Sequence, residues 1–288
     1  MRKFLTLTAA YFLVLLQAAP SHAQWCGKSD EALFDDLGSM LWAGSPPSGE
    51  RPYIYTMAAP WCPYCTQLFK TFQSDRYSFD IRYFEIWPTG DVHRNQIADA
   101  ALNGTNSALA RIYLQRKFSR DGISDAQRSL ANEVQEILSI VIDERYRDRF
   151  SQPKMASPTS IALLDGKIVV IEGTPNLQAL ERLSGSMRRH GRDDRLSGLV
   201  RAGIPSEVPA PDAYYAVRDN VEIRILPDEK AVGAICLKYT QGLRFDGIVT
   251  VSGREWLVTR PFRPDTSLRL YALKDDFVSA TVLDQQKQ

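Results

Sequence analysis

Two cysteines separated by two residues constrain this chain more than any other feature. Cys62 and Cys65 lie in the sequence Trp-Cys-Pro-Tyr-Cys, after an apolar run at 53–59 and at the start of a helix-like stretch at 66–72. Cysteines so spaced at a helix start lie close enough to form a small-loop disulfide. The helix amides and dipole there favour the thiolate form of the first cysteine. The pattern therefore predicts a redox-active dithiol between a strand and a helix.

The residues of this motif are expected to differ in role. Cys62, at the predicted N-cap, is the candidate nucleophile, and Cys65, one turn further in, is the candidate resolving thiol. Pro63 suits the first helical turn, where its missing N–H would have no partner. Tyr64 is expected to be exposed beside Cys62. The alternative is a structural disulfide or half of a zinc site, but zinc needs four ligands and no second Cys/His pair has suitable spacing. We expect neither a metal nor a cofactor.

The beginning of the chain is typical of a secretory signal peptide. Arg2 and Lys3 precede an apolar stretch at 4–16, and small residues occupy the cleavage-site positions before an expected cut after Ala23. An uncleaved membrane anchor is the alternative, although this stretch is shorter than the about 20 residues that span a bilayer. An exported protein is therefore expected.

The charge balance argues against nucleic acid as a partner. The 288 residues include 35 Lys and Arg against 34 Asp and Glu, for a formal net charge of +1. Phosphate binding would call for a basic excess that this composition lacks. The length suits one medium domain and a smaller one.

Cys26 and Cys236 are candidates for a structural disulfide, because disulfides persist outside the reducing cytosol. The bond would tie the mature N-terminus to the C-terminal part. Closing so long a loop would contribute about 4 to 5 kcal/mol on the chain-entropy model. An intermolecular bond through Cys26, or a buried free Cys236, is the alternative.

The expected elements mix helices and strands. An amphipathic helix is expected over 29–41, followed by strands over 53–59 and 81–86 that flank the dithiol helix. Strand, helix and strand in this order imply a parallel pair joined by a crossover.

Helices dominate the middle of the chain. They are expected over about 91–150, the clearest beginning at a capping box that starts with Ser124. A β-hairpin over 159–171 and a helix over 176–189 follow. The pattern is therefore that of an α/β unit with a helical insertion.

This order resembles the thioredoxin fold and, within it, the bacterial periplasmic disulfide isomerase family of DsbC and DsbG. The resemblance rests on the dithiol motif, on Phe-Glu-Ile-Trp-Pro at 84–88 and on the helical insertion before Ser157, Pro158 and Thr159. It implies a periplasmic thiol–disulfide oxidoreductase whose partners are exported client proteins with cysteines and a membrane or periplasmic thiol-redox partner. Glutaredoxins also carry Cys-Pro-Tyr-Cys, but they are far smaller and normally lack an export signal.

The resemblance also implies a cis-proline loop against the dithiol. Pro158 would fill this role, with Ser157 before it, and the loop would offer backbone hydrogen bonds to an extended substrate. Pro153 and Pro175 are weaker candidates.

The sequence has no obvious proton acceptor for Cys65. Where thioredoxins carry a buried acid, this chain has Thr56, so that the proton would pass to water or another group. Glu85 is one candidate, although glutamates near a strand end are mostly solvated. His93 and His190 are expected to be surface residues without partners.

The C-terminal part has short alternating strands and no convincing helix. Its strand patterns, with Trp256 near the last of them, resemble a bacterial SH3-like domain, a module that often binds cell-wall or protein ligands. Trp256 and Tyr214 are expected in its core rather than on a binding surface. The expected division is a leader at 1–23, an N-terminal helix and linker at 24–51, a thioredoxin-like domain at 52–190, a linker at 191–211, the SH3-like domain at 212–277 and a tail at 278–288.

One departure from the resembled family bears on function. Those isomerases carry an N-terminal dimerisation domain, for which only 24–51 is available here. Reduction, isomerisation and formation of disulfides in envelope proteins therefore all stay open. The alternative is a non-catalytic thioredoxin-fold adaptor or chaperone of an envelope assembly, such as a secretion or conjugation apparatus, with contact to the cell wall or envelope complex through the SH3-like domain.

Overall fold

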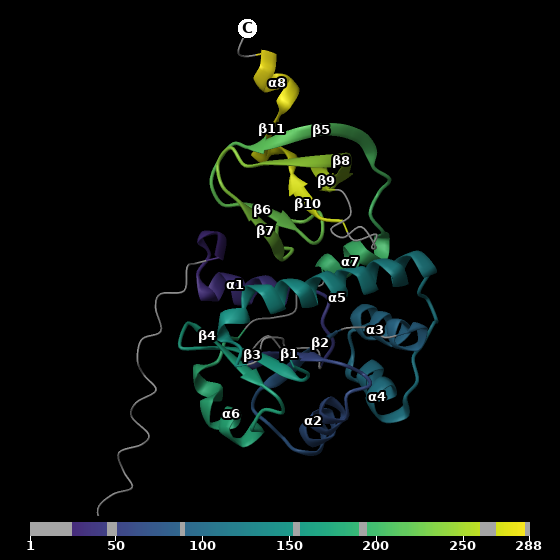
Figure 1. Ribbon diagram of the computed structural model, residues 1–288. Coiled ribbons are helices and arrows are strands. Elements are labelled where there is room, and N and C mark those ends of the chain that lie inside the picture. Colours follow the sequence, from purple (N-terminus) through teal and green to yellow (C-terminus); the bar gives the residue numbers. More distant parts are fainter. Residues whose placement is uncertain are drawn as a thin grey trace, which may run out of the picture.

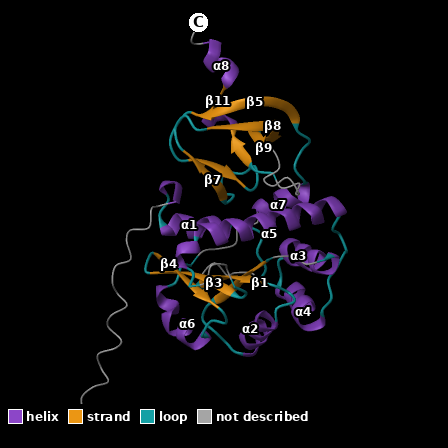
Figure 2. Cartoon of the chain, viewed as in Figure 1, coloured by secondary structure: helices purple, strands orange, loops and turns teal. Residues whose placement is uncertain are grey.

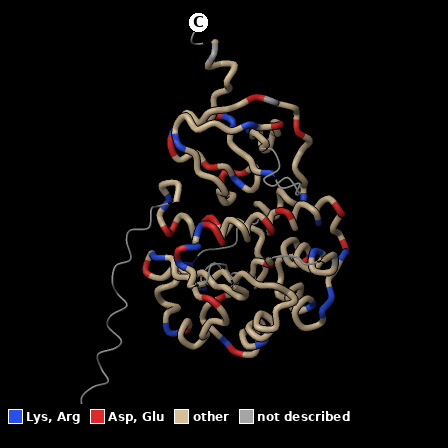
Figure 3. Tube along the Cα trace, viewed as in Figure 1, with Lys and Arg blue, Asp and Glu red and all other residues tan. Residues whose placement is uncertain are grey.

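The computed structural model describes residues 25–44, 51–86, 90–151, 156–189, 195–259 and 269–285. It is a mixed α/β structure with two β-sheets separated by helices (Figures 1 and 2). The expected signal peptide, Pro153 and His190 lie outside the described residues. Within these ranges, no helix is long and apolar enough to cross a membrane. Basic and acidic residues are interspersed along both parts of the trace in Figure 3.

The first sheet has the strand order β2-β1-β3-β4. β1 (Tyr53–Ala58) and β2 (Asp80–Glu85) are parallel, and α2 (Pro63–Ser74) is the crossover between them, as predicted. β3 (Thr159–Leu164) runs antiparallel to β1 and forms the expected hairpin with β4 (Lys167–Glu172). Every residue of β1 and β2 is buried, as in strands that are covered on both faces. The arrangement is consistent with the expected thioredoxin-like fold.

Helices cover both faces of this sheet (Figure 1). α1 (Asp30–Gly38) and α5 (Asp125–Arg145) lie on the side of the second sheet, and α2 and α6 (Leu177–Leu183) lie on the opposite side. α3 (Asp91–Asn103) and α4 (Asn106–Gln115) belong with α5 to the predicted helical segment, and α4 contacts α2. The helical segment therefore reaches the helix that carries the dithiol.

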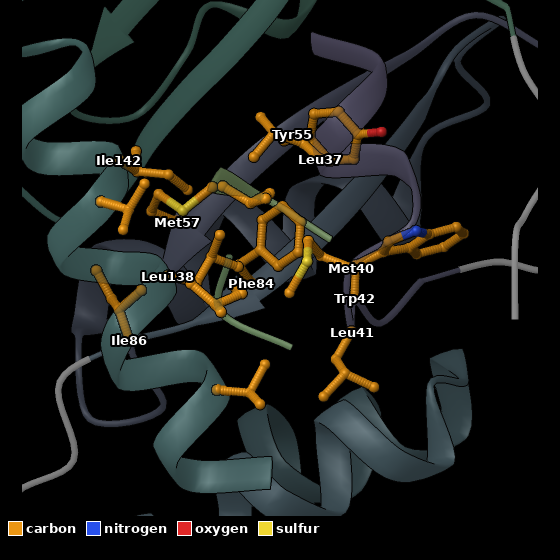
Figure 4. Packing of buried hydrophobic residues seen from close by; sticks show 14 of the residues in the cluster. Leu37, Met40, Leu41, Trp42, Tyr55, Met57, Phe84, Ile86, Leu138 and Ile142 are labelled. Atoms are coloured by element: carbon orange, nitrogen blue, oxygen red, sulfur yellow. The ribbon is translucent and has the colours of Figure 1, made fainter. Parts of the chain in front are cut away.

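α5 begins as its sequence predicts. The Ser124 hydroxyl accepts a hydrogen bond from the Gln127 N–H, and the Gln127 side chain accepts one from the Ser124 N–H. The apolar face of the helix then packs onto the sheet. In Figure 4, Leu138 and Ile142 of α5 lie beside the buried side chains of Met57, Phe84 and Ile86.

The N-terminal segment contributes to the core. α1 packs against β3 and β4, but it ends at Gly38, short of the predicted 41. The chain continues without a helix through Met40, Leu41 and Trp42, whose side chains are buried. Because these side chains already face the core, the expected helix and linker act here as part of the packed unit.

The second sheet is antiparallel, with the order β11-β5-β8-β9-β10-β6-β7. Trp256 and Tyr214 are buried, as expected for core residues. The all-β character agrees with the sequence, and an SH3-like identity stays a prediction. The strands are β5 (Val208–Ala216), β6 (Val221–Arg224), β7 (Gly233–Leu237), β8 (Gly242–Val251), β9 (Arg254–Thr259), β10 (Tyr271–Leu273) and β11 (Phe277–Ser279).

The segments expected as linker and tail carry regular structure. α7 (Arg195–Ala202) and the start of β5 lie within 191–211, and α8 (Ala280–Gln285) lies within 278–288. α7 buries Leu196 and Val200, which are spaced one helical turn apart, and it contacts α3 and α5. The helix within the expected linker was not predicted, because two buried apolar residues one turn apart give a weak periodic signal among polar residues, Gly and Pro.

The predicted disulfide joins the two parts of the chain. Cys26 is bonded to Cys236 on β7, with 5.5 Å between the Cα atoms and a sequence separation of 210. Beside it, the Trp25 ring lies 4.0 Å from the Arg145 guanidinium of α5. One cluster of buried hydrophobic residues includes members of both sheets, so the β-sheet part packs on the rest of the chain.

Candidate dithiol site

The dithiol lies at the N-terminus of α2, where the sequence predicts it. Cys62 is the N-cap residue, and its sulfur accepts a hydrogen bond from the Cys65 N–H at 3.4 Å. Pro63 occupies the first turn, and Pro63 and Tyr64 are exposed. Both cysteines are free thiols, and they differ in access: Cys62 is 9% exposed and Cys65 is fully buried. This difference matches the predicted order of attack.

The loop before β3 contacts both sulfurs. The peptide bond between Ser157 and Pro158 is cis, as the family resemblance implies. The Cys62 thiol donates to the Ser157 carbonyl at 3.3 Å, and the Cys65 sulfur shares a hydrogen bond with the Ser157 hydroxyl at 3.1 Å. The second contact was not predicted, because sequence reasoning gave Ser157 a backbone role only.

Cys65 is held in its protonated form. Burial raises the pKa of this thiol to about 12, against the smaller lowering effects of the Ser157 hydroxyl and the Ala59 N–H. The Ala59 N–H donates to the sulfur at 3.5 Å. At neutral pH, Cys65 must therefore lose a proton during any reaction in which it attacks.

A buried carboxylic acid lies on the strand beside the dithiol loop. Glu85 is 2% exposed, and Cα pairing across β1 and β2 places it opposite Ala58, which precedes Ala59. The Tyr113 hydroxyl of α4 donates to Glu85 Oε1 at 2.8 Å. Burial raises the pKa of Glu85 to about 8. The expectation of a solvated glutamate is thus wrong, because the helical segment covers this strand end.

The charges of Glu85 and of the buried cysteine both act on Tyr113. Burial raises the pKa of Tyr113 well above its usual value, and negative charge on Glu85 or on Cys65 raises it further. Tyr113 is therefore hydrogen-bonded to Glu85 and lies within the electrostatic range of Cys65. Thr56 of β1 is also buried, and its hydroxyl lies 2.9 Å from the Ser160 hydroxyl.

Aromatic side chains border the exposed side of the dithiol. Tyr64 is 67% exposed, and the half-buried Trp61 ring lies 4.5 Å from the His93 ring, centroid to centroid. His93 Nδ1 also lies 3.1 Å from Gln96 Oε1. The expectation that His93 lacks partners is wrong, because the start of α3 packs against the dithiol loop. No group of three or more His, Cys, Asp and Glu in the described ranges could hold a metal ion.

Comparison with known proteins gives little. No protein-family model matches the chain, and no curated protein matches it. Among solved structures, the chain is similar to a disulfide interchange protein from Neisseria gonorrhoeae at 16% sequence identity and a TM-score of 0.33, over 50% of this chain and 95% of that one. So distant a likeness carries no argument about function, which has to come from the geometry of the site.

Proposed function

We propose that this protein is a thiol–disulfide oxidoreductase that reduces, isomerises or forms disulfides in exported proteins through Cys62 and Cys65. The observation that carries the proposal is the contact of both free sulfurs with Ser157, at 3.3 Å and 3.1 Å, beside a helix N-terminus. Cys62 is 9% exposed, whereas Cys65 is completely buried. A pair that serves only to staple the fold would not need this asymmetry.

The chemistry in the reducing direction has two steps. The Cys62 thiolate attacks a client disulfide, so that a Cys62–client bond forms, the client S–S bond breaks and one client thiolate leaves. Cys65 then loses its proton and attacks Cys62 Sγ, which forms the Cys62–Cys65 disulfide and releases the second client thiolate. Two electrons pass to the client, and a thiol reductant, the membrane or periplasmic redox partner, must restore the dithiol. Oxidation of a client is the reverse sequence.

The second step needs a proton acceptor, because the pKa of Cys65 is about 12. The Ser157 hydroxyl is in hydrogen-bond contact with the sulfur. Glu85 is the buried carboxyl group at the neighbouring strand end, and its pKa of about 8 means that the ionised form, which can accept a proton, grows as the pH rises through 8. We propose ionised Glu85 as the final proton acceptor, with Tyr113 as the donor that holds it in place.

The exposed side of the site would bind the client. Ser157 and Pro158 would offer backbone hydrogen bonds to an extended segment, and Pro63 and Tyr64 would contact its side chains. The exposure of Tyr64, at 67%, supports this role. The signal-peptide pattern supports a periplasmic location, and the second sheet, as an SH3-like module, would contact the cell wall or an envelope complex.

The test is the exchange of the mature protein with glutathione. Alkylation and mass spectrometry at defined glutathione ratios give the reduction potential of the Cys62/Cys65 pair, where about −120 mV would mark an oxidant and about −180 to −230 mV an isomerase or reductase. Cys65→Ala should accumulate mixed disulfides with clients, and Cys62→Ala should abolish them. A pair that never exchanges, together with full cellular function of Cys62→Ala, would favour the adaptor instead.

A further inference from the structure

Arg116, at the C-terminal end of α4, contacts the dithiol loop on both sides of Cys62. Its Nη1 donates to the Pro60 carbonyl, and its Nη2 donates to Thr66 Oγ1 at 3.5 Å. The Thr66 hydroxyl in turn donates to the Cys62 carbonyl at 3.3 Å. One guanidinium group therefore joins the residues before Cys62 to the first turn of α2.

The backbone of Arg116 is unusual for a residue with a side chain. It adopts the left-handed conformation, with φ 58° and ψ 32°, as the C-cap of α4. Gly or Asn usually occupies such a position, since a Cβ makes the conformation unfavourable. An arginine here therefore needs another reason, and its contacts with the dithiol loop supply one.

Arg116 also brings a positive charge to the N-terminal part of α2, through its contact with Thr66. No carboxylate in the described parts of the chain forms an ion pair with it. Positive charge near a helix N-terminus adds to the effect of the helix amides on a thiolate at the N-cap. Stabilising the thiolate stabilises the reduced form of a dithiol and makes its disulfide a stronger oxidant.

We infer that Arg116 is a positioning residue for the dithiol: it fixes the loop around Cys62 and shifts the equilibrium of the Cys62/Cys65 pair toward the reduced form. The inference deepens the proposed function and rests on it. The helical segment then takes part in the redox chemistry, because α4 and its C-cap supply Tyr113 and Arg116.

The experiment compares wild type, Arg116→Gly and Arg116→Gln in glutathione buffers. The measured reaction is protein disulfide plus two glutathione thiols giving dithiol plus glutathione disulfide. Both variants should lower its equilibrium constant by about threefold to tenfold, as expected for a charge near a helix N-terminus. Lys117→Ala, which removes the adjacent exposed cation, is the matched control and should leave the constant unchanged.

A stability measurement separates positioning from folding. Arg116→Gly suits the positive φ, so that its thermal unfolding midpoint should equal or exceed that of the wild type. Should the glycine variant fail to fold, Arg116→Gln carries the test. The role of Arg116 is overturned if the folded variants keep the wild-type equilibrium constant with glutathione, or if Lys117→Ala shifts it equally. Either result leaves the proposed function standing. A wild-type protein that does not exchange with glutathione overturns the proposed function itself.

Discussion

The Tyr113 hydroxyl donates a 2.8 Å hydrogen bond to Glu85 Oε1, and both side chains are almost completely buried. The bond connects α4 to the end of β2 beneath the dithiol loop. The Tyr113 ring also stacks on Phe69 of α2, at 5.3 Å between centroids. A single helix therefore orients the buried acid and packs against the helix that carries both cysteines.

Removal of this hydrogen bond should destabilise the protein in a way that depends on pH. In Tyr113→Phe the ring stacking is kept, but Glu85 loses its only protein donor among the described residues. The free energy of unfolding should fall by about 1 to 3 kcal/mol where Glu85 is ionised, and by less where it is protonated. Urea unfolding at pH 6 and pH 9 measures it, and an equal loss at both values would contradict the assignment.

Glu85 itself should make stability fall as pH rises. Its folded pKa, about 8, lies above the ordinary glutamate value of 4.5, so that the folded chain binds this proton more tightly than the unfolded chain. Glu85 does not lower the free energy of unfolding below about pH 4.5. Between about pH 4.5 and pH 8 the loss grows by at most about 1.4 kcal/mol per pH unit, and above about pH 8 it stays constant.

Glu85→Gln is the matched variant, since a glutamine still accepts from Tyr113. The difference in unfolding free energy between variant and wild type isolates Glu85 from other titrating groups. We expect the variant to gain stability relative to the wild type from pH 5 to pH 8. Parallel pH curves would show that Glu85 does not titrate in this range. Mixed-disulfide resolution should also lose an inflection near pH 8 in this variant.

The Ser157 hydroxyl should speed the second chemical step. Ser157→Ala removes its 3.1 Å contact with the Cys65 sulfur and leaves the carbonyl that contacts Cys62. A neutral hydrogen bond is worth about 0.5 to 1.5 kcal/mol, so resolution should slow by about twofold to tenfold. Quenched-flow trapping of the mixed disulfide measures the rate. Ser160→Ala, which removes a nearby hydroxyl bonded to Thr56, is the control, and an equal slowing in it would point to a general packing effect.

The sequence predicts well what depends on local pattern. The start of α5 follows from the hydrogen-bonding groups of Ser124 and Gln127, and the placement of the dithiol follows from a strand, a proline and a helix in succession. The roles of Cys62 and Cys65 could be proposed for the same reason, since N-cap position and depth in a helix are set within a few residues.

What the sequence does not predict depends on contacts between distant segments. Glu85 is buried, and its partner Tyr113 lies 28 residues away in the sequence, on α4. His93 contacts Trp61, and Arg116 contacts Pro60, which lies 56 residues away in the sequence. α7 was missed for another reason: a short helix with few buried residues leaves a weak periodic signal.

The Cys26–Cys236 disulfide should stabilise the whole protein without setting the redox equilibrium of the dithiol. It closes a sequence separation of 210 and joins β7 to the segment before α1, where the sheets share one hydrophobic cluster. Cys26→Ala/Cys236→Ala should lose roughly 2 to 5 kcal/mol of unfolding free energy. Guanidinium unfolding measures the loss, and the glutathione equilibrium of Cys62 and Cys65 should stay at its wild-type value. A large shift in that equilibrium would instead make the bond part of the redox system, whereas unchanged stability would mean that the packing of β7 on α5 already holds the two parts together.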